Sequence, residues 1–136
     1  YDLYNKTPLE ILACVGGYDI CGMVGVFLGA AKHKKVAVID GFISAVAALV
    51  AVRMNEHVID YIIPSHKSRE KQVELVFNEL ALHPTHDLEM RLGEGTGCKL
   101  LFKILDTAVY LMRNMGRYEE IEILSDVLVN IRDKND

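Results

Sequence analysis

"KKVAVIDGFISAVAALVAVRM", residues 34–54, decides the fold class of this chain. Its first part is a short run of β-branched residues that ends in Asp40-Gly41. This composition is typical of an interior strand in a parallel sheet, with a loop at the carboxyl end of the strand. Its second part, residues 42–54, is apolar and rich in alanine, and it predicts a buried helix that is capped near Ser44.

The flanking sequence repeats both signatures. Residues 57–68, "HVIDYIIPSHKS", predict a second strand that breaks at Pro64 and opens into a polar loop. Residues 87–97, "DLEMRLGEGTG", predict either a short strand or an extended segment that leads into a glycine-rich loop. Helices are predicted over 8–15, 18–34, 70–82, 99–115 and 118–133. In the helix over 70–82, Val73, Val76, Phe77 and Leu80 recur at i, i+3, i+4 and i+7, which is the apolar stripe of an amphipathic helix. Because helices alternate with short apolar strands, we expect an α/β fold with a small parallel sheet, flanking helices and further helices at the C-terminal end.

Two details of the first helices carry structural predictions. Thr7 and Glu10 have the spacing of a capping box, and Pro8 suits the first helical position. Gly25 and Gly29 lie four residues apart in the second helix, which predicts close packing of a buried helix.

Composition and charge exclude several classes of protein. The chain has 136 residues, of which 51% are hydrophobic, and a formal net charge of −4, as expected for one compact domain. An acidic balance without a basic stripe argues against nucleic acid as the main partner. The longest apolar run, residues 20–31, is shorter than the roughly 20 residues that span a bilayer, so no membrane partner is expected. Three cysteines without a CxxC spacing predict reduced thiols and a cytoplasmic protein.

Polar residues follow the predicted strands where a ligand crevice forms in α/β sheets. Asp40-Gly41 and Ser65-His66 come directly after strand candidates, and Glu94 follows the extended segment. In such sheets the crevice lies outside the carboxyl ends of the strands. These residues therefore form a candidate site.

The glycine loop, residues 93–97, is the most informative part of that candidate site. Its alternating glycines allow positive φ and close approach of a ligand, and Thr96 can donate its hydroxyl to a phosphate oxygen. Glu94 is then either a solvated turn residue or a base held beside a phosphorylated substrate. The loop lacks the Lys-Ser/Thr ending of a phosphate-binding P-loop, and its spacing differs from the dinucleotide fingerprint. A loop of this kind, taken alone, is structural about as often as it is functional.

The remaining serine, histidine and cysteine side chains do not predict a second catalytic or metal-binding site. Adjacent residues on an extended chain point apart, so Ser65 and His66 are not expected to form a dyad with each other. His83 and His86 flank a proline too closely to frame a zinc site, and no metal or cofactor is predicted. Cys98 is expected to be a small residue that closes the loop, although its place at a helix N-terminus would also suit a thiolate.

Residues 87–97 closely resemble the signature of the nicotinate-nucleotide:dimethylbenzimidazole phosphoribosyltransferases. Residues 8–49, which include Asp40-Gly41-Phe42-Ile43, are similar to the preceding segment of that family, and "YIIPSHKSRE" is similar to its Ser-His-x-Ser stretch. The resemblance runs from about Pro8 to Met112. It departs at Lys71-Gln72-Val73, where the family usually reads Pro-Gly-His, and at Cys98-Lys99, where small residues are usual.

The resemblance implies a reaction and a set of roles. Family members have a Rossmann-like α/β domain, form dimers, and transfer phosphoribosyl from nicotinate mononucleotide to 5,6-dimethylbenzimidazole or a related base. The products are alpha-ribazole phosphate and nicotinate, on the route to the lower ligand of cobalamin. Glu94 takes the place of the family's general base. The other residues that the resemblance assigns to substrate binding are Leu92, Gly93, Gly95, Thr96, Gly97, Asp40, Gly41, Ser65 and His66.

The chain resembles only the C-terminal part of the enzyme, which leaves two alternatives open. We expect residues 8–92 to form the α/β part and residues 93–136 the glycine loop with the C-terminal helices. An N-terminal portion or a companion chain would supply the rest of the pocket, so the chain is expected to be inactive alone. The alternatives are a non-catalytic α/β module that binds a phospho-ligand and an inert structural fragment with exposed apolar helices.

Overall fold

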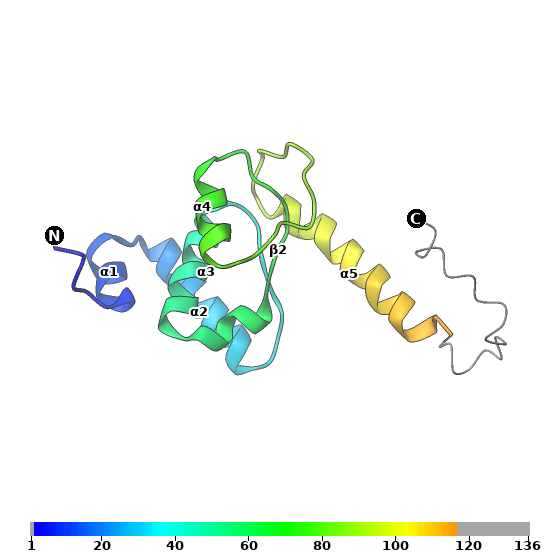
Figure 1. Cartoon of the computed structure of the whole chain (residues 1–136), viewed down its shortest axis with the longest axis horizontal. Coiled ribbons are helices and arrows are strands. Elements are labelled where there is room, and N and C mark those ends of the chain that lie inside the picture. Colours follow the sequence, from blue (N-terminus) through cyan, green and yellow to red (C-terminus); the bar gives the residue numbers. More distant parts are fainter. Residues whose placement is uncertain (1, 117–136) are drawn as a thin grey trace, which may run out of the picture. The chain divides into compact units, whose positions relative to one another are not determined.

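The computed structural model describes residues 2–116 and has the predicted α/β architecture (Figure 1). Its centre is a strand–helix–strand unit, which consists of β1 (Ala37–Ile39), α3 (Phe42–Met54), the 3-10 helix η1 (Glu56–Tyr61) and β2 (Ile62–Pro64). The other elements are α1 (Pro8–Val15), α2 (Tyr18–Lys32), α4 (Gln72–Glu79) and α5 (Thr96–Asn114). The helix predicted over 118–133 lies outside the described residues.

The two strands form a parallel sheet in which Val38 pairs with Ile63. The backbone N–H of Ser65 donates to the carbonyl of Ile39 at 2.9 Å and continues the pairing just past β2. Parallel strands end at the same edge, so this register brings the residues after β1 and β2 together. The predicted small parallel sheet is confirmed.

The second strand is shorter than predicted. Residues 56–61 form η1, and the Asn55 side chain starts this turn by accepting the backbone N–H of His57 at 3.1 Å. Only Ile62–Pro64 are strand. The apolar run 57–63 therefore divides between a helical turn and a strand, a division that its periodicity did not reveal.

The core lies around α3, which contacts α1, α2 and α4. Four alanines of α3 are buried and let neighbouring elements approach closely: Ala45, Ala47, Ala48 and Ala51. From α4, Val73, Val76 and Phe77 are buried, which confirms the predicted apolar stripe. Full burial of a side chain such as Phe77 contributes about 1.5–3 kcal/mol.

Local predictions at the helix ends and along α2 have different outcomes. The capping box at the start of α1 is confirmed: Thr7 Oγ1 accepts the Glu10 N–H at 3.3 Å, and Glu10 Oε2 accepts the Thr7 N–H at 2.8 Å. The Thr7 hydroxyl, which donates to Glu10 Oε2 at 2.7 Å, and next the Thr7 N–H lower the pKa of Glu10. The glycine packing prediction is wrong, because a Cβ placed on Gly25 or Gly29 would meet nothing within 4 Å. The buried residues of α2 are Val24 and Phe27 instead.

The start of α3 also differs from the prediction. Gly41 is the N-cap, and Ser44 lies inside the helix. The Ser44 hydroxyl accepts the backbone N–H of Asp40 at 3.0 Å and donates to the Gly41 carbonyl at 2.9 Å. Ser44 therefore fixes the end of β1 to the start of α3 rather than capping the helix from outside.

The chain divides into two compact units, Tyr1–Lys103 and Ile104–Asp136, and the boundary falls within α5. The first unit contains the sheet and every residue of the candidate site. The expected division between residues 92 and 93 remains a prediction. Over residues 2–116, no helix combines the length and apolar character needed to span a bilayer.

Candidate functional site

A cleft of about 480 Å³ lies at the carboxyl edge of the sheet. Its lining brings together Asp40, Gly41, His66, Leu92, Gly93, Glu94 and Gly95 from the sequence-predicted set. The lining also includes residues that sequence reasoning missed: Met23, Phe42, Ile43, Ser44, Ser68, Glu70 and Arg91. Ser65, Thr96 and Gly97 are not part of the lining, and Ser65 and Gly97 are buried beside it. The strand ends and the glycine loop thus form one site.

The glycine loop makes a left-handed bend before α5. Three successive residues have positive φ: 74° at Gly93, 57° at Glu94 and 73° at Gly95. The Thr96 hydroxyl donates to the Gly93 carbonyl at 2.7 Å, and the Thr96 N–H donates to the same oxygen at 3.1 Å. Both bonds close the bend. Non-glycine residues adopt this conformation rarely, so the backbone at Glu94 is strained.

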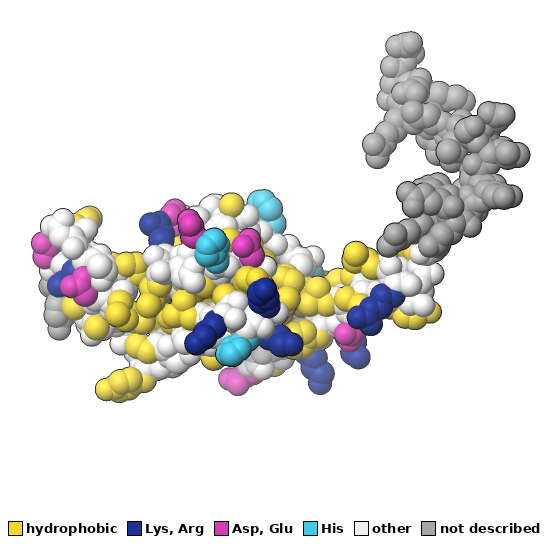
Figure 2. All heavy atoms as spheres, turned by 90° about the horizontal axis from the view of Figure 1, so that it is seen from below, with side chains coloured by type: hydrophobic (Ala, Val, Ile, Leu, Met, Phe, Trp, Pro, Cys, Tyr) yellow, Lys and Arg dark blue, Asp and Glu magenta, His cyan; other side chains and the backbone are white. Residues whose placement is uncertain are grey.

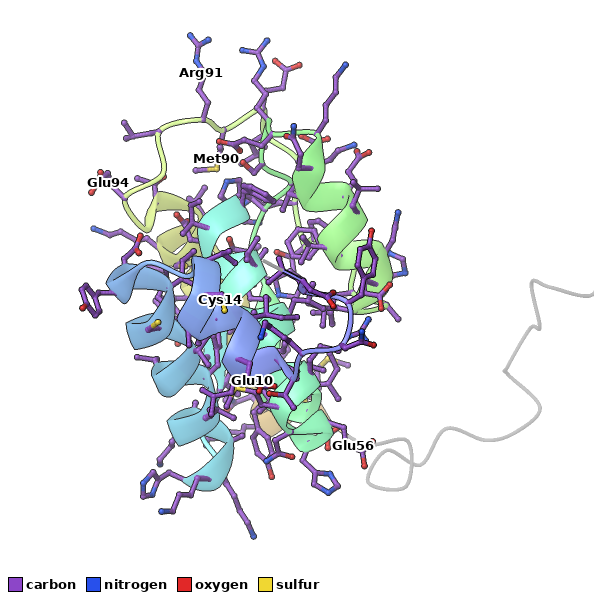
Figure 3. The ribbon with its side chains drawn as sticks, turned by 90° about the vertical axis from the view of Figure 1, so that its left-hand side faces the viewer. Glu10, Cys14, Glu56, Met90, Arg91 and Glu94 are labelled. Carbon is purple, nitrogen blue, oxygen red and sulfur yellow. The ribbon has the colours of Figure 1, made fainter. Side chains whose placement is uncertain are left out.

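Glu94 lies at the outside of this bend, on the rim of the cleft. Its side chain is exposed and points away from the helices, and Arg91 extends outward from the same loop (Figure 3). A carboxylate in this position is accessible both to water and to a ligand that enters the cleft.

Asp40 contacts the glycine loop from the end of β1. Its two carboxylate oxygens accept the backbone N–H groups of Gly95 and Gly97, each at 3.2 Å. The Cys98 thiol lies 3.8 Å from Oδ1 of the same carboxylate. The sequence predicted that a ligand such as a substrate phosphate would lie against this loop, whose backbone N–H groups would then be available to it. In the structure, two of them hold a carboxylate of the protein itself.

Ser65 and His66 are hydrogen-bonded to each other, contrary to the sequence-based prediction. Ser65 Oγ lies 3.0 Å from His66 Nδ1, and both side chains are buried. The prediction failed because β2 ends at Pro64, so the alternation of side chains along a strand no longer applies to these residues.

This pair is not arranged for nucleophilic catalysis. Ser65 Oγ also donates to the Asp40 carbonyl at 3.2 Å, and Asp40 Oδ1 lies 3.9 Å from His66 Nδ1. A catalytic triad needs the hydroxyl and the carboxylate at opposite ring nitrogens, whereas here both approach Nδ1. Ser65 is moreover fully buried. The geometry indicates that Ser65 and His66 support the cleft wall.

His86 packs behind His66 and lies outside the cleft lining. Its ring stacks on His66 with centroids 6.0 Å apart, and its carbonyl accepts the Lys67 N–H at 2.9 Å. Desolvation, with a smaller contribution from His66, lowers the pKa of His86. His86 thus supports His66 by packing rather than by contacting the cleft.

The cleft residues that the sequence analysis missed differ in whether the sequence contains a local signal for them. Phe42 and Ile43 directly follow the predicted Asp40-Gly41, so the start of the next helix was the available signal. Ser68 lies in the polar loop after β2 and donates a hydrogen bond to Glu70, which lowers the pKa of Glu70. Met23 comes from α2 and reaches the cleft only through tertiary packing, for which the sequence holds no local signal.

Cys98 is expected to be chemically unreactive. Burial, and next the nearby Asp40 carboxylate, raise the pKa of this thiol to about 11. At about pH 8 the thiolate population should be about a hundredfold below that of an unperturbed cysteine, and its reaction with a disulfide reagent should be at least about tenfold slower. The rate can be measured with Cys14 and Cys21 replaced by serine. Denaturant should restore ordinary reactivity, and rapid reaction of the native thiol would contradict the burial of Cys98.

Comparison with known proteins identifies the family of this chain. A family model described as phosphoribosyltransferase matches residues 2–123, so the chain belongs to this family of phosphoribosyltransferases. Among its relatives are nicotinate-nucleotide–dimethylbenzimidazole phosphoribosyltransferases of two clostridia. The protein of Clostridium perfringens strain ATCC 13124 is 50% identical over 134 residues, which are 98% of this chain and 37% of the relative. That of Clostridium acetobutylicum is 52% identical over 119 residues, or 88% of this chain and 34% of the relative.

A solved structure shows the same fold. The crystal structure of the nicotinate-nucleotide–dimethylbenzimidazole phosphoribosyltransferase from Thermus thermophilus superposes with a TM-score of 0.81 at 32% identity. The match covers 86% of this chain and 35% of that chain. The family resemblance carried by the glycine loop is therefore confirmed, and the chain spans little more than a third of the length of these relatives.

Proposed function

We propose that this chain supplies the general-base part of an active site that transfers phosphoribosyl from nicotinate mononucleotide to 5,6-dimethylbenzimidazole or a related base. The products are alpha-ribazole phosphate and nicotinate, and the reaction belongs to cobalamin biosynthesis. The observation that carries the proposal is the placement of the Glu94 carboxylate on the rim of a cleft at the carboxyl edge of the sheet. The names of the relatives supply the substrates.

The cleft lining combines apolar side chains, which suit aromatic rings, with a positive charge, which suits a sugar phosphate. Met23, Phe42 and Ile43 offer apolar contacts to a flat ring. Arg91 on the same rim can attract the phosphate. We assign further substrate contacts to Leu92 and to the backbone of Gly93, two of the substrate-binding residues that the resemblance implies.

Proton transfer at Glu94 completes the reaction. The bond between the ribose carbon and the pyridinium nitrogen breaks, and its electron pair leaves with the nicotinate ring, which becomes neutral at that nitrogen. The lone pair of the azole nitrogen forms the new bond, which makes the azole cationic. The Glu94 carboxylate then takes the proton from the other azole nitrogen. General-base assistance of this kind is worth about 10²–10⁴-fold in rate.

We further propose that the chain acts as part of a larger cytoplasmic homodimer. It spans about 37% of its clostridial relatives, so an additional portion or a companion chain would complete the pocket. Large apolar side chains such as Leu9 and Val26 are 58% and 64% exposed, and hydrophobic side chains gather on the face shown in Figure 2. Such surface favours a protein partner. The three free cysteines fit a reducing compartment.

Product analysis tests the proposal. A full-length polypeptide that contains this chain is incubated with nicotinate mononucleotide and dimethylbenzimidazole, and nicotinate and alpha-ribazole phosphate are separated by chromatography. We expect both products in equal amounts from the full-length protein and none from the 136-residue chain alone. Calorimetry with nicotinate mononucleotide is the companion measurement. Binding without any product would instead support a phospho-ligand binding module.

A further inference from the structure

Asp40 connects two parts of the site that are far apart in sequence. It follows β1, and its carboxylate accepts the N–H groups of Gly95 and Gly97, which are 55 and 57 residues further along the chain. Glu94 is the residue directly before this contact. The backbone that carries the proposed base is thus attached to the end of the sheet through one side chain.

We propose that Asp40 is a positioning residue that preforms the glycine loop and holds Glu94 at the rim of the cleft before any substrate binds. This inference rests on the proposed function, because it takes Glu94 as the general base. It gives Asp40 a different role from the substrate contact that the resemblance implies.

The first argument is that Asp40 is itself held rigidly. Its N–H donates to Ser44 Oγ at 3.0 Å, and its carbonyl accepts Ser65 Oγ at 3.2 Å. The residue before it, Ile39, is fully buried in β1. The backbone of Asp40 is therefore fixed before the loop contact is counted, and a rigid attachment point can position a flexible loop.

The second argument is that the loop needs to be held. Glu94 has φ 57°, between two glycines that also have positive φ. A non-glycine residue persists in this conformation only where surrounding contacts determine it. A carboxylate that accepts two backbone N–H groups supplies such contacts, because hydrogen bonds to a charged acceptor are about twice as strong as neutral ones. The contact also lies at the start of α5, where the helix dipole favours a negative charge.

The third argument concerns where the substrate phosphate can bind. The N–H groups of Gly95 and Gly97 already have the Asp40 carboxylate as their acceptor. A phosphate at the same place would have to displace this carboxylate and would be repelled by it. The phosphate is therefore directed to other donors, such as Arg91 on the cleft rim.

Amide hydrogen exchange tests the positioning role without any substrate. In the 136-residue chain, Asp40→Ala should increase the exchange rates of the Gly95 and Gly97 amides by about ten- to a hundredfold, and Asp40→Asn, which keeps one acceptor oxygen, should have an intermediate effect. Asp60→Asn is the matched control, because Asp60 is an exposed residue of η1 outside the cleft lining. It should leave both amides unchanged.

Kinetics of the full-length protein distinguish positioning from substrate contact. If Asp40 positions Glu94, Asp40→Ala should lower kcat by about ten- to a hundredfold and change KM for nicotinate mononucleotide by less than about twofold. A raised KM with unchanged amide exchange would overturn the inference and make Asp40 a substrate contact. Should Asp40→Ala fail to fold, Asp40→Asn decides, and unchanged exchange in that folded variant would refute the inference. If the unaltered full-length protein forms no product, the proposed function fails, and the exchange experiment still tests the Asp40 contact.

Discussion

Replacing Glu94 with glutamine should lower kcat for phosphoribosyl transfer by about 10²–10⁴-fold in the full-length protein. Glutamine has the same shape and can occupy the same bend, but it cannot take the proton of the incoming azole. The carboxylate is exposed on the rim of the cleft, so its replacement should leave the Kd for nicotinate mononucleotide within about twofold of the original. Steady-state turnover and calorimetry on the same preparations measure the two quantities.

The chain offers a closely matched control for this substitution. Glu89 is also an exposed glutamate with positive φ, 52°, and it lies outside the cleft lining. Glu89→Gln should leave both kcat and KM unchanged. Normal turnover by Glu94→Gln would refute its role as the base. Equal losses in the two variants would show that the substitutions act through loop conformation rather than through proton transfer.

Replacing Gly97 with alanine should lower the free energy of unfolding by about 3 kcal/mol, at the upper end of the usual cost of overpacking. A Cβ at this position would lie 2.0 Å from His66 Nδ1 and 2.8 Å from Ser65 Oγ, where no real Cβ can fit. Neither neighbour can move aside easily, because His66 is 2% exposed and Ser65 is fully buried. Urea unfolding followed by circular dichroism measures the loss.

Gly25→Ala is the control for the alanine substitution. Gly25 lies within α2, and an added Cβ there would meet nothing within 4 Å. Alanine in a helix is favoured over glycine by about 1 kcal/mol, so this variant should be as stable as the original or slightly more stable. If Gly97→Ala unfolded at the same urea concentration as the original, the packing of His66 against the loop would be looser than the structure indicates.

Much of this architecture follows from local sequence patterns. The β-branched run before Asp40 predicted β1, and the spacing of Val73, Val76 and Phe77 predicted the buried face of α4. Asp40 and Glu94 were placed at one edge because parallel strands end together, and both line the cleft. Periodicity and strand-end geometry are local rules, and their predictions were correct for β1, for the buried face of α4 and for the edge where the strands end.

The failures concern contacts that local rules do not describe. A three-residue strand is too short to show alternation, so the turn over Glu56–Tyr61 was merged with β2. Glycine spacing in α2 indicated close packing, but spacing does not tell which helix face meets a neighbour. The carboxylate of Asp40 reaches the N–H of Gly95 across 55 residues, and nothing in either segment specifies the other. A partner inside the chain therefore went unrecognised, and a ligand was expected in its place.

The left-handed backbone of Glu94 makes stability and activity favour different residues at this position. Glycine would adopt φ 57° without strain, so Glu94→Gly should raise the thermal midpoint, consistent with relief of about 1 kcal/mol, while removing the proposed base. A directed-evolution campaign scored only on heat tolerance would then enrich inactive proteins at this position. Variant libraries made from this chain therefore need an activity assay as well as a thermal-stability assay. A thermostable variant that retains Glu94 must owe its increased stability to substitutions at other positions.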